Sequence, residues 1–278
     1  MNTISINESK SKVSEENLAK AKKIMVEILE EVDRICTKYG IEYYLSDGTL
    51  LGAIRHGGFI PWDDDLDISM LRKDYNKFLE VAEKELDKRY FLQTAKTDKY
   101  YDIEHVPTKV RHNGSRFIEE DNKKYHQGVY IDIFPMDNVP NSNFKFKLQS
   151  KISSFIMKSS MRMRVKEEKL PLKNELTHLV YRFVLFIFKG KRREMLNNWL
   201  ISLGDENSSE IIYGIDTCWD VTFNRKDIFP LQRIKFEDKY FLAPNNPGAI
   251  LTKMYGDYMK LPPVGERTWH AKEIIIEE

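Results

Sequence analysis

The sequence predicts an α+β fold in which helices flank a mixed β-sheet. Over the first 140 residues, short segments rich in β-branched and aromatic residues alternate with segments whose apolar residues recur every three or four positions. From about residue 141 the pattern changes to long helical segments rich in basic and aromatic residues. We therefore expect a core over residues 1–140, a basic helical insertion over 141–210, and a C-terminal part over 211–278 that completes the core and its substrate site.

The first predicted element is an amphipathic helix over residues 15–39. Its apolar residues lie on one face, because they recur at spacings of three and four. Ser14 can cap the first turn, and Gly40 suits the position after the last turn. The other predicted elements are strands at 41–46, 65–70, 90–94, 106–112 and 128–134, a helical turn in the glycine-punctuated segment after residue 46, and a helix over 72–88.

Composition excludes several classes of protein. The chain of 278 residues is 41% hydrophobic and 31% charged, so it can form a folded core. Its net charge of +1 argues against a nucleic-acid-binding protein. Cys36 and Cys218 lie far apart, which disfavours a disulfide scaffold or a zinc finger. The N-terminus has no apolar signal segment, and the longest apolar run, 183–188, is far short of the roughly 20 residues that span a bilayer. We expect a cytoplasmic protein.

The most informative segment contains four acids in five positions, namely Asp63, Asp64, Asp65 and Asp67. Clustered carboxylates repel one another and raise one another's pKa unless a cation neutralises them. In a strand, Asp63, Asp65 and Asp67 would project to one side and Asp64 to the other. A row of carboxylate oxygens is the ligand set of a hard divalent cation, so we expect Mg²⁺ or Mn²⁺ here. The alternative is an acidic surface turn after Pro61.

Two further features belong with this acidic segment. Gly48 and Thr49 follow a predicted strand and open a helix, where backbone N–H groups can receive a phosphate. Asp132 stands in an apolar strand without a basic neighbour in sequence, and a buried unpaired charge is costly. We expect a metal or a proton to compensate Asp132, with an arginine partner as the alternative.

These stretches resemble the LicD family, which includes bacterial phosphocholine transferases and, more remotely, fukutin and fukutin-related protein. The resemblance rests on DGTLLGAIRHGGFIPWDDDLDI (47–68), the strand with Lys109 and Arg111, GVYIDIFPMD (128–137), FEDKYFLAP (236–244) and MYGDYMKLPP (254–263). It implies a nucleotidyltransferase-like fold whose signature here would be Gly48-Thr49, Asp65-Leu66-Asp67 and Asp132. No motif in 141–227 matches the family. Whether Asp63 is also a ligand stays open.

The resemblance implies transfer of a phospho-alcohol group, most simply phosphocholine, from a CDP-linked donor to a sugar hydroxyl of a cell-surface glycan such as teichoic acid or a lipopolysaccharide precursor, releasing CMP. In that scheme Asp65, Asp67 and Asp132 are both the metal ligands and the catalytic residues, and Asp132 can accept the proton of the acceptor hydroxyl. The same chemistry with ethanolamine, ribitol or glycerol phosphate remains open, as does a nucleotidyltransferase that uses a free NTP, or a binding module with a degenerate site.

Basic residues complete the implied substrate site. Lys109 and Arg111, two positions apart on a strand, share one face and can stabilise phosphate oxygens. The alternative for this pair is a solvated sheet face. Arg55 precedes the acidic segment and can contact nucleotide or acceptor, as can His56, for which loop packing is the alternative. Choline would need an aromatic cage, which the sequence does not single out.

Charge is strongly segregated along the chain. Between Lys145 and Arg193 there are 14 Lys/Arg and three acids, so this segment carries +11 and the remainder −10. Apolar residues, including the run 183–188, accompany these charges. This combination is typical of segments that lie on an anionic leaflet, so we expect a peripheral contact with the inner face of the cell membrane and an acceptor that can be lipid-linked. The alternative is an apolar core segment with a solvated basic face.

Overall fold

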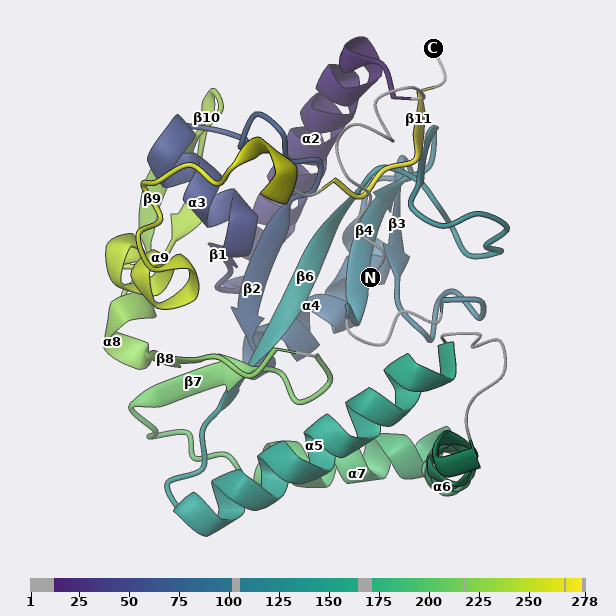
Figure 1. The fold of residues 1–278 in the computed structure, drawn as a ribbon. Coiled ribbons are helices and arrows are strands. Elements are labelled where there is room, and N and C mark those ends of the chain that lie inside the picture. The colour runs from purple at the N-terminus through teal and green to yellow at the C-terminus, as the bar shows by residue number, and fades with distance from the viewer. Residues whose placement is uncertain (1–12, 102–105, 165–171, 218, 268, 277–278) are drawn as a thin grey trace. The chain divides into compact units, whose positions relative to one another are not determined.

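The computed structural model describes residues 13–101, 106–164, 172–217, 219–267 and 269–276 (Figure 1). The chain divides into two compact units. Unit 1 takes its residues from 1–102, 107–135 and 226–278, and unit 2 from 103–106 and 136–225. Each unit is described by itself below.

The centre of unit 1 is a sheet with the strand order β1-β2-β6-β4-β3. In Figure 1, β2 and β6 run side by side with their arrows pointing the same way, whereas β1–β2, β6–β4 and β4–β3 are antiparallel, so the sheet is mixed. The strands are β1 (Tyr44–Leu45), β2 (Asp67–Leu71), β3 (Tyr90–Gln93), β4 (Thr108–His112) and β6 (Tyr130–Asn138). The predicted α+β class and mixed sheet are confirmed.

Helix α2 (Glu15–Tyr39) has the predicted bounds, and local chemistry explains why. The Ser14 hydroxyl accepts a hydrogen bond from the Asn17 backbone N–H at 3.0 Å, and Gly40 adopts a left-handed conformation with φ of 60°. Its apolar face is buried from Ala21 to Cys36. Helix α4 (Arg72–Glu85) packs against α2 and against strands of the sheet, which secures one face of the core.

The acidic segment corrects one sequence-based prediction. Strand β2 begins at Asp67, so Asp63, Asp64 and Asp65 precede the strand, and strict alternation does not apply to them. The cause is a turn at 61–62, where the Asp63 N–H donates to the Ile60 carbonyl at 2.9 Å. The predicted strand 41–46 is likewise shorter, being only β1, because helix α3 (Asp47–His56) begins directly after it.

The C-terminal part of unit 1 returns to the elements formed by the first half of the chain. Strand β11 (Glu273–Ile276) pairs antiparallel with β5 (Ser115–Ile118), and the Asn17 side chain of α2 donates to the Ile274 carbonyl at 2.9 Å. Helix α9 packs against α3. The other elements here are α8 (Arg225–Ile228), the β9–β10 hairpin (Gln232–Phe236 and Lys239–Ala243), α9 (Pro247–Tyr255) and η1 (Val264–Glu266).

Unit 2 combines three helices with a small antiparallel sheet. The end of β6, from Met136 to Asn138, pairs with β7 (Glu210–Tyr213), which pairs with β8 (Thr222–Asn224). The helices are α5 (Asn143–Arg164), α6 (Leu172–Ile187) and α7 (Lys191–Ser202). None of the helices within the described residues is long and apolar enough to cross a membrane. Asp137 lies in β6, where its carboxylate accepts from the Ile215 N–H at 2.9 Å.

Candidate active site

Three elements of unit 1 meet at the acidic segment. The Asp132 N–H of β6 donates to the Leu66 carbonyl at 2.8 Å, which places Asp132 beside the start of β2. The Thr49 hydroxyl, in the first turn of α3, accepts from the Asp67 N–H at 2.7 Å. At Gly48, a Cβ would meet an Asp63 carboxylate oxygen at 2.8 Å, so a larger residue here would require the Asp63 side chain to shift. The turn and the carboxylates that the sequence indicated are therefore brought together.

The carboxylates of this cluster raise one another's pKa. Burial raises the pKa of Asp67 well above its usual range, and the charges of Asp65, Asp47 and Asp132 raise it further. Burial also raises the pKa of Asp63, again with Asp65 as the strongest charged neighbour. Titratable groups with strongly raised pKa values, gathered in one place, are typical of active sites.

Asp132 has a partner that sequence reasoning missed. Its Oδ1 lies 2.6 Å from Nζ of Lys109 in a buried ion pair, because Lys109 and Asp132 face each other in the antiparallel register of β4 and β6. Burial raises the pKa of Asp132 to about 6, although the positive charge of Lys109 opposes this rise. The structure thus compensates Asp132 with a basic side chain, as in the alternative, although with a lysine in place of an arginine. A metal at Asp132 stays a prediction.

Lys109 and Arg111 are 2% and 0% exposed, so the alternative of a solvated sheet face is also wrong. Arg111 donates through Nε to Gln93 and through Nη1 to the Gly128 carbonyl at 2.7 Å, and its guanidinium carbon lies 4.6 Å from the Tyr130 ring centroid. Its Nη2 has no hydrogen-bond partner among the described residues. A contact of either side chain with phosphate stays a prediction.

Asp64 has a different role from the other three acids. Its carboxylate is fully buried and accepts hydrogen bonds from the backbone N–H groups of His270 and Ala271 at 2.7–3.1 Å and from His270 Nδ1 at 2.9 Å. Burial alone would lower the pKa of His270, but the hydrogen bond to Asp64 and the charge of Asp65 raise it to about 10. Asp64 therefore connects the segment before β11 to the acidic loop through hydrogen bonds.

Nδ1 of His270 lies 3.5 Å from Oδ2 of Asp65, so His270 is part of the site. The sequence signal for it was absent, since its partner stands 206 positions away. Sequence reasoning also missed Glu119 and Tyr255. Glu119 accepts from the Tyr130 hydroxyl at 2.9 Å, and Tyr255 lies near enough to the cluster that, after burial, the charges of Asp47 and Asp67 raise its pKa.

A cationic and aromatic group flanks the acidic segment at Trp62. The Arg267 guanidinium carbon lies 3.9 Å from the Trp62 ring centroid, and that of Arg55 lies at 5.9 Å. Arg55 also donates to the Tyr258 carbonyl at 2.7 Å, and burial lowers its pKa. The His56 ring contacts Trp62 edge-on, so the loop-packing alternative for His56 is consistent with the structure. The arrangement offers a partly buried, positively charged aromatic surface.

The donor chemistry of the acidic cluster fits a hard divalent cation. Within the described residues, however, no group of three His, Cys, Asp or Glu side chains is already arranged to hold a metal ion. Mg²⁺ commonly binds through one or two carboxylates and completes its shell with water and substrate phosphates. Asp65 and Asp67 suit that mode, and a third protein ligand at Asp132 remains a prediction.

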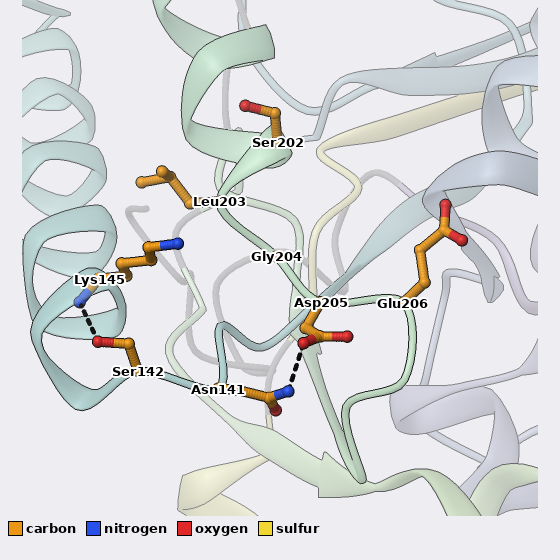
Figure 2. Close-up of a pocket in the computed structure, with 8 residues that line it drawn as sticks. All are labelled: Asn141, Ser142, Lys145, Ser202, Leu203, Gly204, Asp205 and Glu206. Atoms are coloured by element: carbon orange, nitrogen blue, oxygen red, sulfur yellow. Dashed lines mark hydrogen bonds between the residues drawn. The ribbon is translucent and has the colours of Figure 1, made fainter.

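A separate hollow of about 430 Å³ lies in unit 2 (Figure 2). It contains none of the residues discussed above, and the Asn141 amide donates to Asp205 across its wall. Its lining residues are Asn141, Ser142, Lys145, Ser202, Leu203, Gly204, Asp205 and Glu206. Buried carboxylates with raised pKa values are gathered in the acidic cluster of unit 1, which is therefore the better candidate for chemistry.

Comparison with known proteins identifies the family. The model described as "LicD/FKTN/FKRP, nucleotidyltransferase domain" matches residues 40–174. Lipopolysaccharide cholinephosphotransferase LicD of Haemophilus influenzae is 31% identical over 269 residues, which cover 89% of this chain and 93% of that protein. Ribitol 5-phosphate transferase FKRP of Homo sapiens is 51% identical over 35 residues, or 13% of this chain and 7% of that protein. An uncharacterized Rickettsia prowazekii protein, RP689, is 44% identical over 50 residues, or 18% and 19% of the two chains.

The chain belongs to the LicD family, and it is an enzyme of the phosphotransferase type. The resemblance indicated by the motifs is thereby confirmed. The nucleotidyltransferase-like detail of the fold and the roles of individual residues remain predictions.

Proposed function

We propose that this enzyme transfers phosphocholine from CDP-choline to a sugar hydroxyl of a cell-surface glycan, such as teichoic acid or a lipopolysaccharide precursor, and releases CMP. The observation that carries the proposal is the 31% identity over 89% of the chain to a lipopolysaccharide cholinephosphotransferase. The buried carboxylate cluster supports it, because charge neutralisation and positioning supply most of the catalysis in phosphoryl transfer.

Asp65 and Asp67 would hold Mg²⁺ or Mn²⁺, with Asp132 as the proposed third ligand. The bound cation would neutralise charge on the donor phosphates as the leaving group departs. The first turn of α3, with Gly48 and Thr49, would direct backbone N–H groups to a donor phosphate. The Thr49 hydroxyl also accepts a hydrogen bond from the Asp67 backbone N–H, and this contact helps to position the Asp67 carboxylate.

The remaining residues would bind and orient the two substrates. Nζ of Lys109 lies 2.6 Å from Oδ1 of Asp132, and Oδ2 of the same carboxylate would accept the proton of the acceptor hydroxyl. Arg111, with its remaining Nη2 donor, would contact a phosphate oxygen. Arg55, which lies beside Trp62 and donates to Tyr258, would contact the nucleotide or the acceptor. The acceptor can be lipid-linked.

The test is CMP release. The purified enzyme would be incubated with Mg²⁺, a cell-envelope glycan and, in parallel, CDP-choline, CDP-ethanolamine, CDP-ribitol or CDP-glycerol. CDP-choline should be the best donor, and phosphodiester formation should accompany CMP release. Asp67→Asn should lose this release, whereas Glu80→Gln, which removes an exposed acid from α4, should keep it.

A second candidate donor is CDP-ribitol, which the short 51% match to a ribitol 5-phosphate transferase favours. If CMP release is faster with CDP-ribitol than with CDP-choline, the proposed transfer of phosphocholine is wrong. The reaction would still be the transfer of a phospho-alcohol from a CDP-linked donor. Turnover of free NTP to pyrophosphate, without CMP release from any CDP-alcohol, would replace the proposal with a nucleotidyltransferase activity.

A further inference from the structure

Helix α6 of unit 2 exposes a continuous apolar stripe. Leu179, Phe183 and Phe186 are 62%, 63% and 76% exposed, and their spacing of four and three residues puts them on one face of the helix. Val180 beside them is exposed as well. Soluble surfaces seldom gather large apolar side chains in this way, and such patches mark interaction sites.

Helix α5 adds a basic stripe with an exposed aromatic at its centre. Lys151, Phe155 and Lys158 follow the same spacing and are all exposed. The Phe155 ring contacts the Tyr181 ring of α6, with 5.8 Å between the centroids, and the two helices pack on each other. Tyr181 lies two positions from both Leu179 and Phe183, so α5 packs on the side of α6 away from the apolar stripe. We call the exposed residues of the two helices together the α5–α6 surface, with the apolar stripe of α6 as its docking face.

The charge of the α5–α6 surface has one sign. The stretches 143–160 and 179–193 together contain nine Lys/Arg and no Asp or Glu. Several of these basic residues are exposed, namely Lys145, Lys147, Lys151 and Lys158 of α5, Arg182 of α6, Lys189 just after α6, and Lys191 and Arg192 at the start of α7. A partner that covers this surface must combine an apolar interior with dense negative charge.

We propose that the α5–α6 surface docks onto an anionic phospholipid bilayer. Phe183 and Phe186 would enter the boundary between headgroups and acyl chains, where aromatic side chains are favoured. Arg182, three positions after Leu179 and four before Phe186, and the exposed Lys189 would contact lipid phosphates, with the aliphatic stem of Arg182 along the apolar stripe. This is peripheral binding by helices that lie on the membrane. It uses none of the residues placed in the acidic cluster, so it stands or falls apart from the proposed transfer.

Self-association of the surface is the main competitor, and the charges disfavour it. Two copies meeting through this face would bring two sets of like charges together without an acid from either surface to neutralise them. An anionic leaflet meets the same charges with complementary sign. Binding to lipid should therefore weaken strongly as salt rises.

Vesicle co-sedimentation of the full-length protein tests the proposal. Vesicles of phosphatidylglycerol and phosphatidylcholine in equal amounts would be compared with phosphatidylcholine alone, each at 50 and 500 mM NaCl. We expect at least tenfold stronger binding to the anionic vesicles at low salt and at least a fivefold loss at high salt. Equal binding to both vesicles, or none to either, would overturn the proposal.

Variants with matched controls assign the binding to this surface. Phe183→Asp/Phe186→Asp should weaken binding at least tenfold, Phe183→Leu/Phe186→Leu should keep it within threefold, and Tyr240→Asp/Met259→Asp, at exposed positions of unit 1, should keep it within twofold. If the leucine pair binds as weakly as the aspartate pair, or the unit 1 pair weakens binding equally, the apolar stripe is not the docking element.

The basic residues beside the apolar stripe have their own charge-matched control. Arg182→Glu/Lys189→Glu should weaken binding at least tenfold, whereas Lys73→Glu/Lys84→Glu, at exposed positions of α4, changes net charge equally and should not. Equal losses in both would show a non-specific charge effect and contradict the proposal. Light scattering completes the set, because a wild-type dimer that Phe183→Asp/Phe186→Asp dissociates would make a second copy the occupant.

Discussion

At the scale of single residues, the ion pair between Lys109 and Asp132 determines how substitutions at either position affect stability. Asp132→Asn would leave the Lys109 charge buried and unpaired, which costs about 3–5 kcal/mol. Lys109→Met/Asp132→Asn removes both charges and should retain most of the stability. We expect both variants to lose transfer, and the loss should not add to that of Asp67→Asn if the two aspartates serve one unit.

Thermal melts beside CMP-release rates separate the two effects. Wild-type-like transfer by the stable Lys109→Met/Asp132→Asn variant would make the pair purely structural. Multiplicative losses with Asp67→Asn would place Asp132 outside the metal unit.

Asp64 should behave differently from its neighbours when changed to asparagine. An asparagine oxygen can still accept backbone hydrogen bonds from His270 and Ala271, but it loses the charge that strengthens them. Asp64→Asn should therefore lower stability by about 1–3 kcal/mol and keep transfer within tenfold. Asp65→Asn should do the reverse, with a loss of roughly 10²–10³ in rate and little change in stability. Comparing the free energy of unfolding with kcat for both variants checks this, and matching profiles would refute the division of roles.

The residues that the sequence did reveal share one property. Asp65, Asp67, Gly48 and Thr49 lie within 20 positions of one another, so local spacing was enough to group them. Asp132 stood out because an acid in an apolar strand needs compensation. Its actual partner depends on the β4–β6 register, which no local pattern encodes.

At the scale of elements, the loop before β6 contains a histidine, His126, whose protonation is coupled to folding. His126 accepts from the Gly128 N–H through Nδ1 and pairs with the Asn113 side chain through Nε2, which requires a neutral ring. Burial, followed by the charge of Arg111, lowers the pKa of His126 to about 4. In the unfolded chain the same group titrates near ~6.5.

Stability should therefore fall as pH drops from about 6.5 toward 4, because only the unfolded state binds the proton in that window. His126→Asn keeps an acceptor for Gly128 and cannot titrate. The wild type should lose about 1–2 kcal/mol relative to this variant across the window, since the partly buried His126 ring is still partly screened by solvent. Urea unfolding at pH 7, 5.5 and 4.5 measures it. Parallel pH dependences would show that His126 does not carry the effect.

Elements with strong local signals were predicted well. Helix α2 has its own cap, stop residue and apolar face, so its predicted bounds match the structure. Strands were less certain at their ends: 106–112 and 90–94 correspond to β4 and β3, whereas 128–134 extends to Asn138. That extension depends on pairing with β7, which is more than 70 residues away. The β5–β11 pairing has the same origin.

At the scale of the whole molecule, the segregated charge predicts that stability depends on divalent cations. The segment 145–193 carries +11 and the remainder −10, and the acidic cluster concentrates part of that negative charge in one buried place. A ligand that binds only the folded state stabilises it, by about 2.7 kcal/mol at a hundredfold excess over Kd. For a chain of this size that corresponds to a rise in melting temperature of roughly 5–10 °C.

We therefore expect Mg²⁺ to raise the melting temperature of the wild type, and NaCl at equal ionic strength to raise it less. Asp67→Asn removes one of the repelling charges, so without Mg²⁺ its melting temperature should equal or exceed that of the wild type. The same substitution removes a proposed ligand, so the Mg²⁺-dependent rise should disappear. Differential scanning calorimetry of both proteins, with and without Mg²⁺, measures the two effects together. A variant that is less stable than the wild type without Mg²⁺ would mean that Asp67 stabilises the fold. A variant that keeps the full rise in melting temperature with Mg²⁺ would mean that the cation binds elsewhere.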